Sequence, residues 1–280
     1  MNPTTITPVP ETQLLNRPDG KIGYDVAGTG PLVVLVPGMG DLRSAYRFLA
    51  PSLRSSGYRV ACTDLRGHGD SDPNFSSYGD PETASDIAHL IEELGGPAVI
   101  VGNSMAAAAA TLVAGDRPDL VDGLVLIGPF VRNGKANAMQ RILLRVAMAP
   151  PWAAASWKSY LPKLYAGSRP DDFEEYRERV VASLRRPGYA KAFSLTTRTN
   201  HDPAEVRLGD VTAPTMVIMG DRDPDFADPA AEAGWIGKSL NAEVVMIAEA
   251  GHYPQSQQHD FTTRAVLRFL EAVSDQDIVQ

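Results

Sequence analysis

A serine between small residues stands where an expected strand meets an expected helix. The segment Gly102-Asn103-Ser104-Met105-Ala106 follows the apolar run 98–101 and opens the alanine-rich run 105–114. A tight strand-to-helix turn of this kind is a nucleophile elbow, which exposes the serine hydroxyl at the carboxyl edge of a sheet. The usual pattern has glycine at the second small position, where this chain has Ala106. The segment therefore predicts Ser104 as a nucleophile.

A serine hydroxyl needs a base to attack at neutral pH, and the chain has five histidines. Three of them stand on expected helices or in a region without strands: His89, His201 and His259. His68 lies in a glycine-rich loop after an earlier strand, where a role in the turn is an open interpretation. His252 follows the last expected strand, at the same edge of the sheet as Ser104, and is the predicted base.

The base needs a carboxylate that fixes its tautomer and stabilises its charged form. Asp221, Asp223 and Asp225 share the loop that follows the apolar run 215–219. The other place for the acid, directly after the run 124–127, contains no carboxylate. The acid is therefore expected in the later loop, where the pattern alone leaves all three aspartates open.

Short apolar runs that alternate with helical patterns must position these loops. Strands are expected at 31–36, 58–62, 98–101, 124–127, 215–219 and 243–247, after a hairpin around Pro18-Asp19-Gly20. Continuous apolar strands are typical of a sheet that is covered on both faces. The alternation predicts a mostly parallel α/β sheet flanked by helices, with right-handed crossovers. No core strand is expected between 127 and 215, so residues 131–210 are predicted to form a helical insertion.

Four motifs in this order make the chain similar to the α/β-hydrolase superfamily from residue 22 to residue 270. They are Val36-Pro37-Gly38-Met39-Gly40, Asp64-Leu65-Arg66-Gly67-His68-Gly69-Asp70-Ser71, Gly102-Asn103-Ser104-Met105 and Gly251-His252. The resemblance implies an eight-stranded sheet, a core of residues 11–130 and 211–280, and a cap at 131–210. Residues 1–10, which are rich in threonine and proline, are expected to be a flexible lead-in.

The resemblance also assigns roles to residues. It implies that Asp223 is the acid of the triad and that the backbone N–H groups of Met39 and Met105 form an oxyanion hole. The first loop usually reads His-Gly, whereas this chain has Pro37-Gly38, a departure that bears on the geometry of the loop. The aromatic side chains of the cap are expected chiefly to form its core, and two or three of them also to line a pocket. The candidates for this lining are Phe130, Trp152, Trp157, Tyr160 and Tyr253.

The expected reaction is hydrolysis of a carboxylic ester or lactone through an acyl-enzyme, without a metal or an organic cofactor. Gly102-Asn103-Ser104-Met105 and Leu126-Ile127-Gly128-Pro129 are also similar to the meta-cleavage-product hydrolases. Hydrolysis of a carbon–carbon bond is therefore the alternative, because the same triad serves both chemistries. A third interpretation is a non-catalytic ligand receptor on the same fold, against which the intact triad argues.

Composition disfavours nucleic acid and anionic membranes as binding partners, so the expected partner is a small-molecule substrate. The 280 residues carry 26 Lys and Arg against 34 Asp and Glu, and this net charge of −8 disfavours binding to nucleic acid or to an anionic membrane. The single cysteine, Cys62, excludes an intramolecular disulfide. No apolar run reaches the length of a membrane span, and the N-terminus lacks the pattern of a signal peptide, so a cytoplasmic location is expected. The oligomeric state stays open.

Charge is distributed unevenly along the chain. Residues 131–210 hold 14 Lys and Arg and 8 Asp and Glu, a surplus of six positive charges, whereas the other residues hold 12 against 26. A basic cap that docks on an acidic core explains this distribution, and is favoured here. The alternative is that cap arginines steer or hold an anionic substrate.

Overall fold

The structure is a computed structural model that describes residues 10–134 and 138–277. Eight strands form one sheet: β1 (Gln13–Arg17), β2 (Gly20–Ala27), β3 (Leu32–Val36), β4 (Arg59–Thr63), β5 (Ala98–Asn103), β6 (Val121–Ile127), β7 (Thr215–Gly220) and β8 (Glu243–Ile247). Their order across the sheet is β1-β2-β4-β3-β5-β6-β7-β8. The predicted lead-in lies outside the described residues except for Pro10.

The sheet is parallel from β4 to β8, and the N-terminal hairpin adds two antiparallel strands to it. The carboxyl ends of β3, β5, β6, β7 and β8 therefore meet at one edge. The loops that carry the candidate residues leave the sheet at that edge. This arrangement confirms the predicted fold class and the eight strands.

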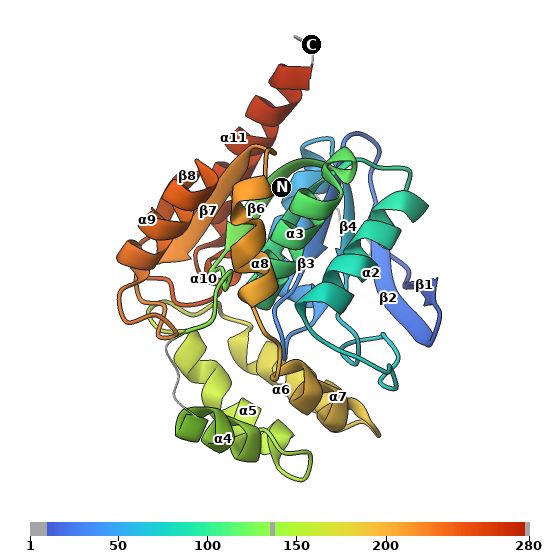
Figure 1. The fold of residues 1–280 in the computed structure, drawn as a ribbon, viewed down its shortest axis with the longest axis vertical. Helices are drawn as coiled ribbons and strands as arrows, with labels where there is room; N and C mark the ends of the chain where they lie inside the picture. Colours follow the sequence, from blue (N-terminus) through green and yellow to red (C-terminus); the bar gives the residue numbers. More distant parts are fainter. Residues whose placement is uncertain (1–9, 135–137, 278–280) are drawn as a thin grey trace, which may run out of the picture.

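The helices within the described residues cover the sheet and extend beyond one edge (Figure 1). They are α1 (Leu49–Ser55), α2 (Asp80–Glu93), α3 (Met105–Asp116), α4 (Ala138–Ala147), α5 (Ala153–Leu164), α6 (Phe173–Leu184), α7 (Tyr189–Thr196), α8 (Asp202–Arg207), α9 (Pro229–Leu240), α10 (Pro254–Gln257) and α11 (His259–Asp277). Single 3-10 turns occur at Arg43–Tyr46, Pro118–Leu120 and Leu208–Asp210. In the part of the chain that is described, no helix combines the length and the apolar character that crossing a membrane requires.

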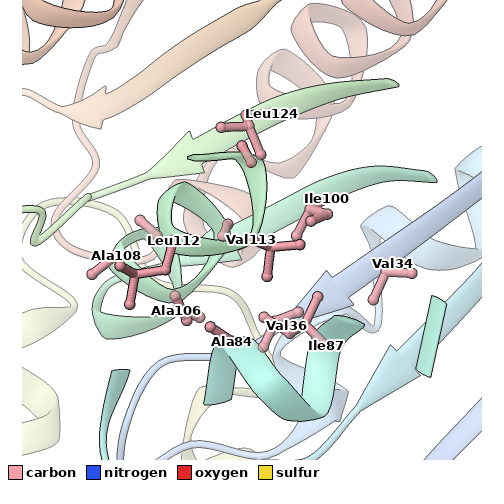
Figure 2. Close-up of a cluster of buried hydrophobic side chains, with 14 of the residues drawn as sticks. Val34, Val36, Ala84, Ile87, Ile100, Ala106, Ala108, Leu112, Val113 and Leu124 are labelled. Carbon is pink, nitrogen blue, oxygen red and sulfur yellow. The ribbon is translucent and has the colours of Figure 1, made fainter. Parts of the chain in front are cut away.

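Alternate side chains of the central strands supply two apolar cores. Val34 and Val36 of β3 point to the face covered by α2 and α3, where the alanine-rich α3 packs close to the sheet (Figure 2). Val33 and Leu35 point to the opposite face, which is covered by α1 and α11. The strands are thus buried on both sides, as their unbroken apolar runs predict.

The expectation of two covered faces is wrong for the last strand. β8 lies at the edge of the sheet, and Val244 and Met246 are each 38% exposed. An edge strand has a neighbour on one side only, so its apolar residues keep contact with solvent.

Helices α4 to α7 lie together beyond the carboxyl edge of the sheet, in green to yellow in Figure 1. We call these four helices the cap helices. α8 also falls within 131–210, but it packs against α3 of the core. Aromatic residues of the cap, among them Trp157, Tyr176 and Phe193, join the same apolar core as α1 and α11. The cap helices are therefore packed onto the core by a continuous apolar contact.

Candidate active site

Ser104 lies between β5 and α3 and has a backbone conformation that residues other than glycine rarely adopt. Its φ is 59° and its ψ is −124°. A non-glycine residue in such a region costs on the order of 1–3 kcal/mol and is held there by its surroundings. Two hydrogen bonds to the adjacent β6 segment hold it: Ser104 N donates to Ile127 O at 2.9 Å, and Phe130 N donates to Ser104 O at 3.3 Å.

Small residues are required around this turn. A Cβ on Gly102 would lie 2.6 Å from the backbone oxygen of Ala106, and a Cβ on Gly38 would lie 2.8 Å from the Cβ of Ser104. Ala106 itself fits, because it is an ordinary residue of the buried helix α3. The departure from glycine at this position therefore leaves the turn intact.

His252 and Asp223 form a buried hydrogen-bonded pair. Nδ1 of His252 lies 2.6 Å from Oδ2 of Asp223, and both residues are 2% exposed. Because a carboxylate only accepts, Nδ1 carries the hydrogen and Nε2 is left as the basic nitrogen. Burial acts to lower the pKa of His252, but the carboxylate of Asp223 outweighs it and raises that pKa to about 9.

A second carboxylate, that of Asp225, lies near the same ring. Its Oδ2 is 4.0 Å from Nδ1 of His252, and its Oδ1 accepts a hydrogen bond from the Tyr160 hydroxyl at 2.5 Å. The N–H of Asp225 donates to Asp223 Oδ1 at 3.0 Å. Asp221 is exposed instead, so the nearest rival to Asp223 is Asp225. The possible metal-ligand atoms of Asp223, Asp225 and His252 lie within 4.8 Å of one another. Nδ1 of His252, however, already donates its hydrogen bond to Asp223.

Two amide side chains that the sequence reasoning did not single out connect the loops. Asn103 Nδ2 donates to Ile127 O at 2.9 Å and to His252 O at 3.2 Å, which joins the serine turn to the histidine loop. Gln257 Oε1 accepts from the N–H groups of Gly251 and Tyr253 on either side of His252. Residue type gave no signal here, since asparagine and glutamine of this kind are common on surfaces.

The backbone donors expected from the resemblance also flank Ser104. Met105 is the first residue of α3, and Met39 follows Gly38, the glycine that has no room for a Cβ beside Ser104. This chain lacks the usual loop histidine, but another histidine, His68, contacts the loop. Nε2 of His68 accepts from Gly40 N at 2.9 Å, while Nδ1 donates to Arg66 O at 2.9 Å. Burial lowers the pKa of His68 to about 4, so the ring stays neutral and keeps this tautomer.

Asp41, in the same loop, is a buried acid that sequence reasoning missed. It is fully buried, and Oδ1 accepts from Leu42 N at 2.9 Å and from the hydroxyl of Tyr176. Oδ2 has no hydrogen-bond partner among the described residues. Burial raises the pKa of Asp41 to about 6, against the effect of the Tyr176 hydrogen bond.

The five aromatic residues expected to line a pocket fall into two groups. The ring of Phe130 lies 5.8 Å from that of His252, Tyr253 is in edge contact with His252 at 5.2 Å, and Tyr160 bonds Asp225. Trp157 is buried and bonds the loop of Met39. Trp152 differs, because it is 48% exposed and its indole N–H donates to Val146 O within the cap. The hydrogen bond of Trp152 therefore ties it to the cap and not to the site.

Another histidine–aspartate pair also contacts Phe130. His201 Nδ1 is 2.6 Å from Asp80 Oδ2, and its ring stacks on Phe130 at 5.8 Å. Thr199 Oγ1 donates to the other oxygen of Asp80 at 2.8 Å. This pair joins the end of the insertion to the start of α2. The serine turn contacts the β6 segment and the His252 loop, so His252 is the better candidate for the base.

A cavity of about 560 Å³ lies apart from this cluster, between α1, α6 and the loop after β3. Its lining includes several arginines but none of the candidate catalytic residues. Arg43, which lies in it, already pairs with Asp25, Asp64 and Asp70. Arg47 and Arg54 pair with Asp172 and Asp25. Because none of the candidate catalytic residues lines this cavity, the serine turn stays the candidate site.

Comparison with known proteins gives a consistent family. Residues 33–265 match the model of the alpha/beta hydrolase family. The chain is 26% identical over 265 residues to 2-(acetamidomethylene)succinate hydrolase of Mesorhizobium japonicum, covering 90% of the chain and 93% of that protein. It is 29% identical over 273 residues to 2-hydroxy-6-oxononadienedioate/2-hydroxy-6-oxononatrienedioate hydrolase 1 of Dechloromonas aromatica, covering 90% and 91%.

A solved structure has the same fold. The bromoperoxidase of Bacillus anthracis superposes with a TM-score of 0.82 at 21% identity, covering 93% of this chain and all of that one.

Proposed function

Because the chain belongs to the alpha/beta hydrolase family and is an enzyme, we propose that it is a serine hydrolase that cleaves a carboxylic ester or lactone. Ser104 is the nucleophile, His252 the general base and acid, and Asp223 the residue that orients His252. The N–H groups of Met39 and Met105 bind the developing oxyanion.

The first half of the reaction forms an acyl-enzyme. Ser104 Oγ attacks the carbonyl carbon while its proton passes to Nε2 of His252, and the carbonyl oxygen becomes an oxyanion. When the tetrahedral intermediate collapses, the bond to the leaving oxygen breaks and that oxygen takes the proton from His252. In the second half, water loses a proton to His252 and attacks the acyl carbon, and Ser104 regains its proton as the acid leaves.

The observation that carries this proposal is the 2.6 Å hydrogen bond between His252 and Asp223 at the edge where Ser104 stands in a strained turn. A histidine held by a buried carboxylate through Nδ1 presents Nε2 as the base. The strain at Ser104 adds support, since backbone strain of this size is retained mainly at functional sites.

Hydrolysis of a carbon–carbon bond is the second candidate. It is favoured by the relative from Dechloromonas aromatica, a hydrolase named for 2-hydroxy-6-oxononadienedioate, which is similar to this chain over 90% of its length. The same three residues serve this chemistry. The proposal of an ester or lactone therefore differs from it in substrate and not in the residues used.

A substrate panel separates the two candidates. Wild type, Ser104→Ala and a control, Ser52→Ala on α1, are assayed with p-nitrophenyl esters, lactones and a vinylogous dienoate. We expect turnover of an ester or lactone by wild type and the control, and loss of it in Ser104→Ala. Turnover of the dienoate alone would replace the first candidate by the second. Full activity of Ser104→Ala on any substrate would overturn both.

A further inference from the structure

The loop that carries the proposed oxyanion donor Met39 is held from outside by three side chains, and two of them come from the cap helices. We call residues 37–42 the oxyanion loop. His68 contacts it from the core, Trp157 from α5 and Tyr176 from α6. The contacts fall on Gly40 and Asp41, the two residues that follow Met39.

Both polar groups of Gly40 are fixed. Its N–H donates to Nε2 of His68 at 2.9 Å, and its carbonyl accepts from the indole N–H of Trp157 at 2.7 Å. Gly40 has a φ of 74°, and a Cβ there would lie 2.5 Å from the Trp157 ring, so the indole packs directly on the backbone. His68 of the core therefore holds the peptide between Met39 and Gly40, and Trp157 of the cap holds the next peptide, between Gly40 and Asp41.

Asp41 extends the contact to a second cap helix. Its Oδ1 accepts from the Tyr176 hydroxyl and from Leu42 N, and its N–H donates to Gly38 O at 3.3 Å. A buried carboxyl with one unpartnered oxygen is costly. An apolar residue would avoid this cost but would also lose the hydrogen bond that joins the loop to α6.

The loop has little freedom on its other side. Gly38 lies against Ser104, where an added Cβ would approach the Cβ of the serine to 2.8 Å. Met39 is thus placed between a glycine confined by the nucleophile and a glycine confined by His68 and Trp157. A displacement of the cap would reach the N–H of Met39 through Asp41, because the N–H of Asp41 donates to Gly38 O, the carbonyl of the same peptide unit.

From these contacts we propose that Trp157 and Tyr176 are positioning residues of the oxyanion hole, so that the cap completes the catalytic site as well as covering it. The inference rests on the proposed function, because it takes Met39 N–H as an oxyanion donor. Neither side chain is assigned a contact with the reacting atoms. Loss of a whole oxyanion donor costs about 100- to 1000-fold in kcat, so a misplaced donor should cost less, about 10- to 100-fold.

The test uses Trp157→Phe and Tyr176→Phe, which remove one N–H and one hydroxyl. Their controls are Trp152→Phe, an exposed cap tryptophan, and Tyr189→Phe, whose hydroxyl joins α7 to Ser71 O at 3.0 Å away from the loop. On p-nitrophenyl acetate, we expect kcat to fall about 10- to 100-fold in the two test variants, with KM changed less than about threefold. Both controls should stay within about twofold of wild type.

A second readout separates positioning from general loosening. A trifluoromethyl ketone forms a tetrahedral adduct with the serine, so its inhibition constant should rise by the same factor as kcat/KM falls. In Trp157→Phe the apparent pKa of the kcat/KM profile should stay unchanged, since His252 and Asp223 are untouched. Circular dichroism and thermal unfolding check that each variant is folded. If one of the two test variants is unfolded, the kinetics of the other test variant decide.

The outcomes distinguish this inference from the proposed function. Folded test variants with wild-type kcat, or with a loss confined to KM, would overturn the positioning role and leave the triad standing. Wild type that neither turns over an ester nor binds the trifluoromethyl ketone would overturn both.

Discussion

Replacing Asp41 by asparagine should change how stability depends on pH. The pKa of Asp41 is raised from its ordinary value of 3.8 to about 6 by burial. The folded protein therefore holds this proton more tightly than the unfolded chain does. The stability that Asp41 contributes by binding this proton is fully present below pH 3.8 and is lost as the pH rises through about 6. A shift of about two pKa units corresponds to about 3 kcal/mol, of which roughly 2–3 kcal/mol falls between pH 4 and pH 7.

The amide of the Asp41→Asn variant cannot ionise, so this loss should be absent from it. That amide places a nitrogen where Oδ2 has no partner among the described residues, and this adds a cost that does not depend on pH. The informative quantity is therefore the difference between the two unfolding free energies, measured by urea titration from pH 4 to pH 8 at fixed ionic strength. We expect that difference to move by roughly 2–3 kcal/mol in favour of the variant.

Asp172→Asn is the matched control. The hydrogen bond from Arg47 holds the pKa of this half-buried aspartate below its usual value, so its stabilising effect is lost as the pH falls. That loss falls below pH 3.8, the ordinary pKa of this carboxyl, so its difference curve should be nearly flat from pH 4 to pH 8. A flat difference curve for Asp41→Asn would refute the reasoning, because it would mean that the carboxyl is solvated or paired in the folded protein.

Four further results are expected. Asp223→Asn should lower kcat by roughly 10⁴, as a wrong tautomer does in the serine-protease triad, and Asp221→Asn far less; a reversed ranking would move the acid. Gly38→Ala should lower kcat at least tenfold, because its Cβ would meet Ser104 at 2.8 Å, whereas Gly234→Ala, which has open space, should keep it. A fluorophosphonate should add once, at Ser104, by mass spectrometry; an adduct elsewhere would contradict the assignment. An ester that ends in carboxylate should exceed its methyl-ended match in kcat/KM by less than tenfold, and the ratio should fall with salt; a larger, salt-resistant preference would indicate a direct arginine contact.

The parts of the site that the sequence predicted are those set by neighbouring residues. Ser104 can be named as the candidate nucleophile because an apolar strand, a small-residue turn and a buried helix follow one another within a short segment around 102–106. His252 was identifiable because it closely follows the last strand. The fold class came from the same kind of information, since strand runs and helical periodicity extend over only a few residues.

The choice among the aspartates shows where such information ends. Asp221, Asp223 and Asp225 share one loop, and only the resemblance selected Asp223. Which carboxyl reaches the imidazole depends on the path of the turn, and the turn directs Asp221 to solvent and Asp225 to Tyr160. Residue type is identical at all three positions and carries no information on this path.

Contacts across long separations escaped the sequence altogether. Gly40 pairs with His68 at a separation of 28 residues and with Trp157 at a separation of 117. The contact of His68 with this loop depends on how two loops meet in space. Trp152 and Trp157 show the same limit, because both are cap tryptophans and only one faces the core.

The surplus positive charge of residues 131–210 is only partly explained by docking on the core. Among the described residues of this segment, two arginines pair with core carboxylates, Arg132 with Glu232 and Arg207 with Asp116. The pair between Asp172 and Arg47 has the reverse sense. Partly exposed ion pairs contribute about 0–1 kcal/mol each, so the buried apolar contacts of the cap must supply most of its attachment.

We expect the remaining surplus to act at a distance. Among the described residues, the hydrogen-bond and ion-pair partners of His252 and Asp223 include no arginine of the insertion. A field of unpaired positive charge beside a cleft still raises the local concentration of anions, and salt screens it over about 8–10 Å. The cap would then affect catalysis in two separable ways. Its charge would act on the approach of the substrate, and its buried hydrogen bonds to the oxyanion loop would act on the chemical step.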